Sequence, residues 1–448
     1  MKIIIVGAGA VGYQIANHLI LENKDVVVIE KDPARAKFVN NNLDCFVVCG
    51  SSTCVDDLID AGIKDAEFFI CVTESDEVNM ISCGIVSSEF NVPNKIARIR
   101  NLNYIDSKII SEKFLGIDYI VNPETEAAEQ IIKTIESGAL SDLVSFQNID
   151  VQIRNINMAG YPGFAGKTIK DLKTEIDNDF LVAAIRRKNE LIIPFGNTVI
   201  NPEDIVYIVA EHLTFEKIFV KIGNAKENLR KIIIVGGGKI GTAVLDKLVE
   251  SGNRQLAIIE SDYDICKKIS EKYPDVLVLN ADIRDEQIFD IENIAGYDLI
   301  VMITNNEELN ILSAIYAKKL GTHRAISLVI NNNYLHLSTQ LGIDSAISPK
   351  VSSVNTILKH IRKGNVRTVF SIFDGKAEIS EFFISDQENL INKPIKSIQM
   401  PPNSLIIGIS RNGKNIIPDG NFSIQPGDVI LTITSKESIN KIEKIFNS

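Results

Sequence analysis

The residues that could carry chemistry in this sequence are two groups of glycines, each followed by an acidic side chain. In the first group, Gly7, Gly9 and Gly12 follow the apolar run KIIIV, and Glu30 ends the next apolar run. This G-x-G-x-x-G spacing is typical of a loop that turns tightly after a strand, lets the backbone approach a pyrophosphate and opens a helix. The glutamate 23 residues after Gly7 would accept hydrogen bonds from ribose hydroxyls.

The same group occurs a second time. Gly236, Gly238 and Gly241 follow another KIIIV run, and Glu260 stands 24 residues after Gly236. Each loop follows a strand pattern and precedes a helix pattern, as nucleotide binding requires, so we expect a nucleotide at both. A carboxylate at the ribose repels a 2′-phosphate, which favours NAD or an adenine nucleotide over NADP.

The two loops differ at a position that bears on the ligand. Lys239 stands inside the second loop where Ala10 stands in the first. A cation there could meet an additional phosphate and favour ATP or ADP, or it could be a solvent-facing residue at the helix N-terminus. Both interpretations stay open. Lys31, directly after Glu30, is expected to be a solvated surface charge.

The elements that must position these loops are also duplicated. VVVIEKD returns as LAIIESD after 230 residues, and LGIDYIVNPE from Leu115 returns as LGIDSAISPK from Leu341. A longer segment that starts at Leu181 recurs from Leu405, displaced by 224 residues. The displacement shrinks slowly along the chain, as small loop deletions within a tandem duplication would produce.

Each copy predicts two kinds of domain. Short apolar runs (KIIIV, DVVVIE, DCFVVC, FFICVT and KIARIR in the first copy) alternate with segments of helical apolar spacing. This alternation favours right-handed βαβ crossovers and a parallel sheet. PETEAAEQIIKTIESG and PKVSSVNTILKHIRKG then each predict a helix with proline near its start and glycine past its end. About 80 residues rich in β-branched side chains follow and predict a small α+β unit.

The predicted fold class is therefore α/β: two Rossmann-like parallel-sheet domains alternating with two small α+β domains. We expect a Rossmann-like, nucleotide-binding domain in residues 1–124 and a small domain in 140–224. A second Rossmann-like domain is expected in 229–350 and a second small domain in 366–448. The polar stretch GNAKENLR is expected to be a linker between the copies.

Composition and charge exclude several classes of protein. The 448 residues are 45% hydrophobic and 23% charged, as in globular proteins rather than disordered chains. Forty-seven basic and 58 acidic side chains give a net charge of −11, which argues against nucleic-acid binding. No stretch approaches the roughly 18 to 20 apolar residues of a membrane-spanning helix, and the opening MKIIIVGAGAVG lacks a signal-peptide pattern. A cytoplasmic protein is expected.

No group of residues fills the role of a catalytic centre. A dehydrogenase needs a proton donor or acceptor beside the nicotinamide, but the five histidines have no counterpart across the repeat and no ligand spacing. They are His18, His212, His323, His336 and His360. Asp56, Asp57 and Asp60 fit a solvated helix face better than a metal site, and the six cysteines are expected to be reduced structural thiols. Glycine loops without a reaction centre indicate a sensor rather than an enzyme, with neither catalytic residues nor a metal.

Over essentially its whole length the chain resembles the nucleotide-binding regulatory subunits of bacterial and archaeal Trk-type potassium uptake systems, the TrkA family. Beyond the two loops, the first copy carries DLIDAGIKDAEFFICVTESDEVNMISC, VPNKIARIRNLNY and FLGIDYIVNPE. The second copy carries LGTHRAISLVINNNYLHLSTQLGIDSAISPK and ILKHIRKGNV. Both copies contain the pattern P-x-G-x-x-x-I-x-P-x-D, which ends at Asp204 in the first copy and at Gly427-Asp428 in the second.

The resemblance implies two potassium-regulating (RCK or KTN) nucleotide domains, each followed by a small C-terminal domain called RCK_C. It also implies a homo-oligomeric ring, expected to be a tetramer, held on the cytoplasmic face of the membrane by a TrkH- or TrkG-like potassium-translocating subunit. Occupancy by NAD(H), or by ATP and ADP, would change the shape of the ring and so gate that subunit.

By the same resemblance, each site consists of the glycine loop, the acid at the ribose and residues that follow the inner strands. For the first site these are Gly7, Ala8, Gly9, Ala10, Val11, Gly12, Glu30, Thr73, Glu74 and Arg98. For the second site they are Gly236, Gly237, Gly238, Lys239, Ile240, Gly241, Glu260, Asp282, Thr304 and Asn305. Thr73 and Arg98 fall at the carboxyl ends of strands, where the crevice of such a sheet collects ligands.

Each site departs from the family pattern in its own way. The G-D-A segment of the family reads Gly50-Ser51-Ser52 in the first copy, which loses an aspartate near the adenine, whereas the second copy keeps Asp282. Arg98 aligns with Leu328, so the second site lacks that guanidinium. We infer two sites of unlike ligand preference, or one weak site.

The favoured function is a ligand-sensing regulatory subunit without catalysis. An NAD-dependent oxidoreductase is the alternative that rests on the loops alone. A third possibility is the gating ring of a different potassium channel or efflux transporter.

Overall fold

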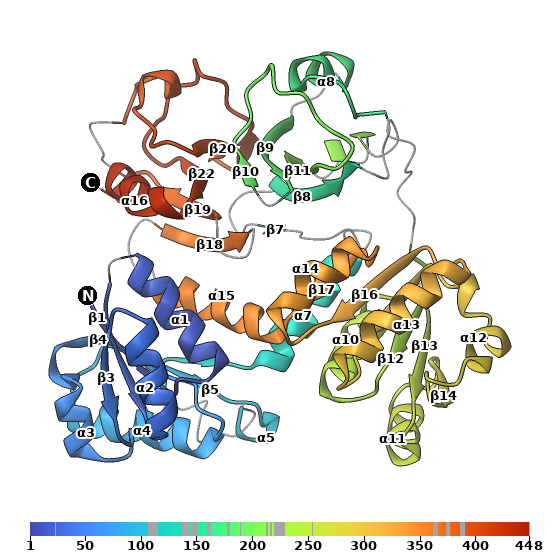
Figure 1. Cartoon of the computed structure of the whole chain (residues 1–448), viewed down its shortest axis with the longest axis horizontal. Helices are drawn as coiled ribbons and strands as arrows, with labels where there is room; N and C mark the ends of the chain where they lie inside the picture. Colours follow the sequence, from blue (N-terminus) through green and yellow to red (C-terminus); the bar gives the residue numbers. More distant parts are fainter. Residues whose placement is uncertain are drawn as a thin grey trace. The chain divides into compact units, whose positions relative to one another are not determined.

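The computed structural model describes most of the chain and divides it into two compact units (Figure 1). The described residues are 1–22, 24–105, 115–136, 144–145, 151–158, 163–176, 180–188, 190–211, 214–215, 217–218, 229–252, 254–361, 366–372, 377–385 and 390–447. The first unit comprises Met1–Glu126 and Pro349–Lys363, and the second comprises Ala127–Ser348 and Gly364–Ser448.

The first unit is built around a six-stranded parallel sheet with the order β3-β2-β1-β4-β5-β6. Its strands are β1 (Lys2–Val6), β2 (Asp25–Glu30), β3 (Phe46–Cys49), β4 (Ala66–Cys71), β5 (Asn94–Arg98) and β6 (Tyr119–Val121). Its helices are α1 (Ala10–Leu21), α2 (Pro33–Asn42), α3 (Val55–Asp60), α4 (Asp76–Glu89) and α5 (Leu102–Ile105). The strand order reverses between β1 and β4, which creates the switch-point crevice at the carboxyl ends of these strands.

After Lys2, the run KIIIV is apolar because both faces of the sheet are covered. Ile3 and Ile5 belong to one buried cluster, and Ile4 and Val6 belong to another. The Rossmann-like prediction is therefore confirmed. The sequence patterns predict five strands; the sixth, β6, has only three residues and is too short to give a pattern of its own.

A helix from the second copy completes the first unit. The residues of α15 (Pro349–Ile361) that enter the apolar cluster of β1 and α1 are Val354, Ile357, Leu358 and Ile361. The imidazole of His360 stacks on the ring of Tyr119 with centroids 4.0 Å apart. The Thr356 hydroxyl donates a hydrogen bond of 2.8 Å to Oε2 of Glu126.

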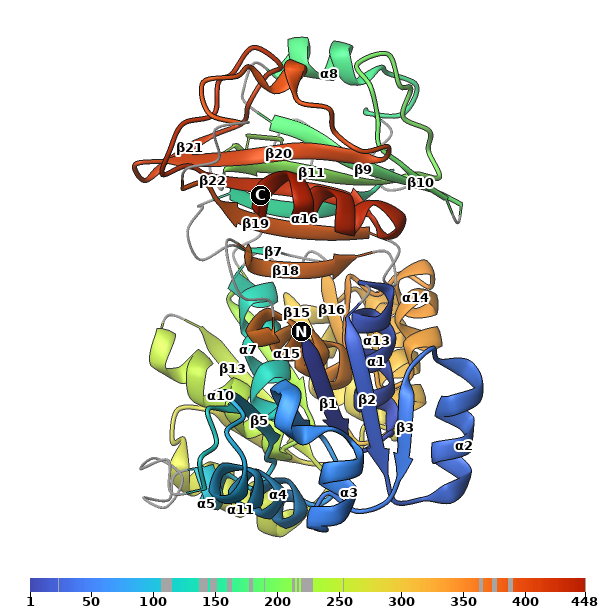
Figure 2. The same cartoon turned by 90° about the vertical axis from the view of Figure 1, so that its left-hand side faces the viewer.

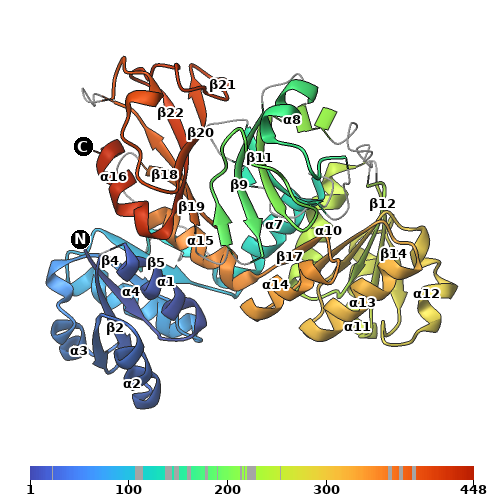
Figure 3. The same ribbon diagram turned by 45° about the horizontal axis from the view of Figure 1, so that its top comes forward.

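The second unit contains a matching six-stranded parallel sheet with the order β14-β13-β12-β15-β16-β17 (Figure 3). Its strands are β12 (Lys231–Val235), β13 (Gln255–Glu260), β14 (Leu277–Asn280), β15 (Leu299–Met302), β16 (Arg324–Leu328) and β17 (Ser345–Ile347). Its helices are α10 (Lys239–Ser251), α11 (Tyr263–Lys272), α12 (Gln287–Ile291), α13 (Glu307–Leu320) and α14 (Asn332–Gln340). One apolar cluster joins α10 and α11 to the sheet, and another joins α12, α13 and α14 to it.

The helix that follows β6 packs in this second unit. The residues of α7 (Pro123–Glu136) that share a cluster with β12 and α10 are Ala127, Ala128, Ile131 and Ile135. The two copies thus exchange the helix that leaves the parallel sheet. The sequence predicts both helices correctly but not the exchange, because the two have the same apolar spacing and either could cover either sheet.

The second unit also holds two five-stranded antiparallel sheets, one from each copy (Figure 2). The first has the strands β7 (Val144–Ser145), β8 (Val151–Asn157), β9 (Phe180–Arg187), β10 (Glu190–Ile192) and β11 (Ile205–Glu211). The second has the strands β18 (Val366–Ile372), β19 (Ala377–Phe383), β20 (Ser404–Arg411), β21 (Lys414–Ile416) and β22 (Val429–Ser435). The sheets pack face to face through one shared cluster, which includes Tyr207, Val209, Ile379 and Leu431. Their other faces are covered by α8 (Ile169–Ile176) and α16 (Ile439–Asn447), which confirms the predicted α+β units.

Several sequence features lie at the limits of what the structure describes. Of the predicted closing helix TFEKIFVKIG, only 214–215 and 217–218 are described, and the linker GNAKENLR lies mostly outside the described residues, as does His212. No helix in the described part of the chain is long and apolar enough to span a bilayer. The six cysteines are free; Cys71, Cys83 and Cys266 are buried.

Candidate functional site

The first glycine loop connects β1 to α1, and two of its glycines are demanded by the backbone. Gly7 has φ of +93°, and a side chain there would press against Thr73. A Cβ on Gly12 would lie 1.9 Å from the carbonyl oxygen of Gly7. A Cβ on Gly9, by contrast, would meet nothing within 4 Å. Packing does not require glycine at position 9, and the space above the start of α1 is open there.

The second loop, between β12 and α10, repeats this geometry. Gly236 has φ of +111°, and a Cβ on Gly241 would lie 2.0 Å from the Gly236 carbonyl oxygen. A Cβ on Gly238 would again meet nothing within 4 Å. Neither Gly9 nor Gly238 can cap its helix with a side chain, so the amides of the first turn stay available to an anion.

The two acidic residues hold the loops in the same way. Oε2 of Glu30 accepts a hydrogen bond of 2.6 Å from the Ala8 amide, and Oε1 accepts one of 2.9 Å from the Asp32 amide. Glu260 repeats both bonds, at 2.6 Å to the Gly237 amide and 2.9 Å to the amide two residues further on. Each carboxylate therefore lies beside its glycine loop at the end of the second strand, where the ribose of a nucleotide would be expected.

The inner strand ends are tied together by a buried asparagine that sequence reasoning missed. Oδ1 of Asn79 accepts hydrogen bonds from the Thr73 amide at 3.0 Å and the Thr73 hydroxyl at 2.7 Å, and its Nδ2 donates to the Arg98 carbonyl at 2.8 Å. Asn310 makes the same three bonds in the second copy, at 3.0, 2.6 and 3.1 Å. Both asparagines are almost completely buried. Their recurrence 231 residues apart is a signal that a residue-by-residue comparison of the copies would have found.

Arg98 lies half-buried at the end of β5 in a group of charged side chains. Its Nε has no hydrogen-bond partner among the described residues, and neither has Oε2 of Glu124. Burial lowers the pKa of Arg98, as does Arg100, whereas Glu124, Asp76 and Glu74 raise it. A buried guanidinium with an unused donor at the switch point can bind an anionic group. Glu124 was not predicted as part of this site because it belongs to the helix after β6.

The second site lacks this charge. Leu328, the counterpart of Arg98, is buried. After β14, Nε of Arg284 donates hydrogen bonds to both oxygens of the Asp282 carboxylate, at 2.9 and 3.0 Å. Hydrogen bonds from the Arg284 side chain and backbone lower the pKa of Asp282 to about 2.

At the equivalent place in the first copy, Oδ2 of Asp57 accepts a hydrogen bond of 2.7 Å from the Ser51 amide. Asp57 therefore closes the loop after β3, while Asp56 and Asp60 are exposed as expected. Among the described residues, no group of His, Cys, Asp or Glu side chains could hold a metal ion. His18 lies in the last turn of α1, at the end opposite to the glycine loop.

These features define a class of protein: a tandem pair of Rossmann-like domains with glycine loops, combined with two small antiparallel-sheet domains. Two solved structures share this fold. The GsuK channel bound to NAD aligns with a TM-score of 0.57 and 19% identity, covering 99% of this chain and 78% of that one. The GsuK RCK domain aligns with a TM-score of 0.56 and 19% identity, covering 99% of this chain and 94% of that one.

Family models and relatives narrow this class. The TrkA-N domain model matches residues 3–123 and 232–349, and the TrkA-C domain model matches residues 159–219 and 379–447. The Trk system potassium uptake protein TrkA of Halomonas elongata is 32% identical over 100% of this chain and 98% of its own length. The TrkA homolog 1 of Methanosarcina mazei is 30% identical over the full length of both chains. The chain belongs to the TrkA family, as its sequence resemblance predicts.

Proposed function

We propose that this chain is a nucleotide-sensing cytoplasmic regulatory subunit of a Trk-type potassium uptake system. It binds NAD(H), ATP or ADP and gates a membrane-embedded potassium-translocating subunit of the TrkH or TrkG kind. The observation that carries the proposal is the pair of matching loops: each has an uncapped helix N-terminus, open space at its middle glycine and a carboxylate at the ribose position. The name of a structural neighbour, the GsuK channel bound to NAD, supports NAD as one ligand.

The proposed sites are the two sets of ten residues named from the sequence. Residues 1–124 and 229–350 act as the nucleotide-binding domains, and 140–224 and 366–448 act as the regulatory C-terminal domains. The two sites differ in ligand preference, because Arg98 offers a cation where Leu328 offers an apolar surface. The chain works as a homo-oligomeric ring, a tetramer, bound to its membrane partner on the cytoplasmic face.

Gating by a nucleotide requires a difference in affinity between two conformations of the ring. A ligand that binds both conformations equally shifts nothing, however tightly it binds. A ligand that binds one conformation ten times more tightly stabilises it by about 1.4 kcal/mol relative to the other. The proposal therefore concerns differential binding, and it requires no catalytic residue.

The test is calorimetric titration of NAD, NADH, ATP and ADP onto the full chain and onto Gly9→Asp and Gly238→Asp. Aspartate is a good helix N-cap and has room at both positions, so each variant is expected to fold, while its carboxylate repels a phosphate. We expect each variant to weaken at least one nucleotide tenfold or more. Unchanged binding of all four nucleotides in both variants would contradict the proposal.

The oxidoreductase alternative is separated by incubating the chain with NADH and carbonyl compounds. Steady oxidation of NADH would favour an enzyme. A regulatory subunit binds the cofactor without consuming it.

A further inference from the structure

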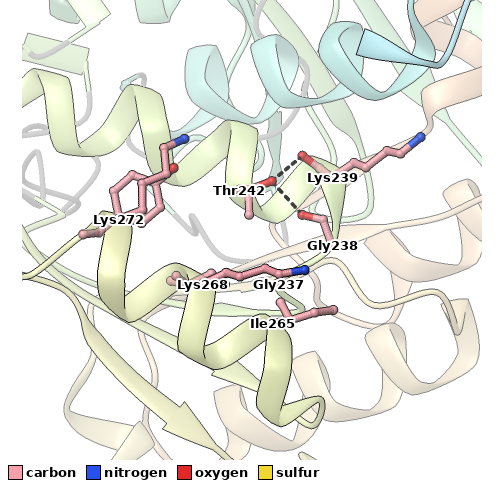
Figure 4. A pocket seen from close by; sticks show the side chains of 9 residues that line it. Gly237, Gly238, Lys239, Thr242, Ile265, Lys268 and Lys272 are labelled. Atoms are coloured by element: carbon pink, nitrogen blue, oxygen red, sulfur yellow. Dashed lines mark hydrogen bonds between the residues drawn. The ribbon is translucent and has the colours of Figure 1, made fainter. Parts of the chain in front are cut away.

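A pocket of about 340 Å³ lies beside the second glycine loop, in the groove between α10 and α11 (Figure 4). Its lining includes Ile269 and Tyr273, both buried, and Thr242 of α10. Lys268 of α11 extends along the groove toward Gly237. A volume of this size is in the range of small-molecule sites.

The first copy carries aromatic side chains at the corresponding positions. The helices α2 and α11 correspond residue by residue, since each has an aspartate N-cap that accepts two amide hydrogen bonds. Phe38 is thereby the counterpart of Lys268, and Tyr13 on α1 is the counterpart of Thr242. The rings of Tyr13 and Phe38 meet with centroids 5.7 Å apart. Two rings in contact thus stand in one copy at the positions where a threonine and a lysine line the pocket in the other.

The charges around the pocket favour an anion. Lys272, at the far end, is paired with Asp246 at 2.8 Å, and the Tyr273 hydroxyl donates to the same carboxylate. Within the described part of the chain, Lys268 forms no ion pair with a carboxylate. The nearby carboxylate of Glu260 is already held by two backbone amides. Lys268 therefore lies uncompensated beside the apolar side chains of Ile269 and Tyr273, near the positive end of α10.

We propose that this pocket binds a phosphate group in the second copy only, with Lys268 as its cation and Ile269 and Tyr273 beneath the apolar part of the ligand. The phosphate can come from the nucleotide held at the second loop or from a separate phosphorylated metabolite. The inference goes beyond the proposed function, because Thr242, Lys268, Ile269 and Tyr273 belong to neither predicted set of site residues. The pocket shares only residues of the glycine loop with the second set.

The test compares three variants of the full chain by calorimetric titration with ADP and with inorganic pyrophosphate at fixed ionic strength. Lys268→Ala removes the cation. Thr242→Tyr combined with Lys268→Phe rebuilds the ring pair of the first copy and fills the pocket. Lys267→Ala is the matched control, because it removes an exposed lysine from the same helix that does not line the pocket.

We expect the first two variants to lower the affinity for ADP or pyrophosphate at least tenfold. The control should change either affinity by less than twofold. Repeating the titration in Gly238→Asp identifies the source of the phosphate. Pyrophosphate binding that survives in this variant and still depends on Lys268 indicates a separate metabolite. Pyrophosphate binding that disappears indicates the nucleotide held at the second loop. Wild-type affinities for both probes in Lys268→Ala would overturn the inference, even if the double variant failed to fold. Failure of the proposed function is a different result, in which both loop aspartates leave every nucleotide unaffected.

Discussion

At the scale of single residues, the glycines of each loop do two separate jobs. Gly12 is required by packing, because its α-carbon lies almost against the carbonyl of Gly7, whereas Gly9 has open space around it. The spacing alone predicts the loop but assigns the same importance to every glycine. The structure separates the glycines that shape the loop from the one that leaves room for a ligand.

This difference gives a stability prediction. Gly12→Ala is expected to lower the free energy of unfolding by about 3 kcal/mol, since a methyl group 1.9 Å from a backbone oxygen forces the loop to move. Gly9→Ala, the matched control, is expected to change it by less than about 1 kcal/mol. Denaturant unfolding of the full chain followed by circular dichroism measures both. Equal effects of the two substitutions would contradict the packing argument.

The repeated pattern that ends at Asp204 and Asp428 is also explained at this scale. Asp204 is fully buried and accepts hydrogen bonds from Nε and Nη2 of Arg187 at 2.9 and 2.8 Å, as well as from the Asn201 amide at 2.8 Å. The hydrogen bonds that Asp204 accepts from Arg187 raise the pKa of that guanidinium. Asp428 repeats the same arrangement with Arg411. The aspartate is therefore a clamp on the preceding loop.

Removing the arginine should be costly. Arg187→Leu leaves the buried Asp204 carboxylate without its charged partner, and we expect a loss of about 3 kcal/mol in the free energy of unfolding. Adding Asp204→Asn should restore part of this loss, because the uncompensated charge is gone. A double-mutant cycle measured by chemical denaturation would show this coupling. Strictly additive effects would argue against the clamp.

At the scale of elements, the exchange of α7 and α15 ties the two copies together. His360 of α15 contacts Tyr119 of β6, and burial, together with Lys359, lowers the pKa of His360. As pH falls, the imidazole of His360 is therefore protonated in the unfolded chain at a higher pH than in the folded chain. The contribution of His360 to stability is full above its ordinary pKa of about 6.5 and declines as pH falls below that value.

We accordingly expect α15 to loosen in mild acid. Hydrogen–deuterium exchange of the peptide Pro349–Ile361 should be faster at pH 5.5 than at pH 7.5, after correction for the intrinsic pH dependence of exchange. His360→Phe keeps a stacking ring that cannot titrate, and it should flatten this dependence. An equally steep dependence in the variant would show that another group is responsible.

At the scale of the whole molecule, duplication followed by divergence makes the two Rossmann-like domains unequal. The first has Arg98 at the switch point and the ring pair of Tyr13 and Phe38, and the second has Leu328 and a pocket lined by Lys268. A regulator with two unlike sites can respond to two ligands. The proposed function depends on the differences between the two domains rather than on their similarity.

This leads to a prediction for the assembled system. In vesicles that contain the full chain and a TrkH-like subunit, we expect nucleotides to change the rate of potassium uptake. Gly9→Asp and Gly238→Asp should each remove part of this response, and different nucleotides should be affected by each. Sedimentation of the purified chain should give the mass of four copies. A monomer whose variants respond identically to every nucleotide would contradict the proposal.

The sequence by itself determined the parallel-sheet class, the tandem duplication, both glycine loops and the acids beside them. These features are local, since a tight turn, a helix start and a buried strand each demand particular residue types at fixed spacing. Only the tertiary structure decided which sheet α7 and α15 cover, how Asn79 joins two strand ends, where Glu124 stands relative to Arg98, and that a lysine and a threonine line a pocket beside the second loop. Those outcomes depend on contacts between residues far apart in the chain, and no local pattern encodes which partner each side chain will meet.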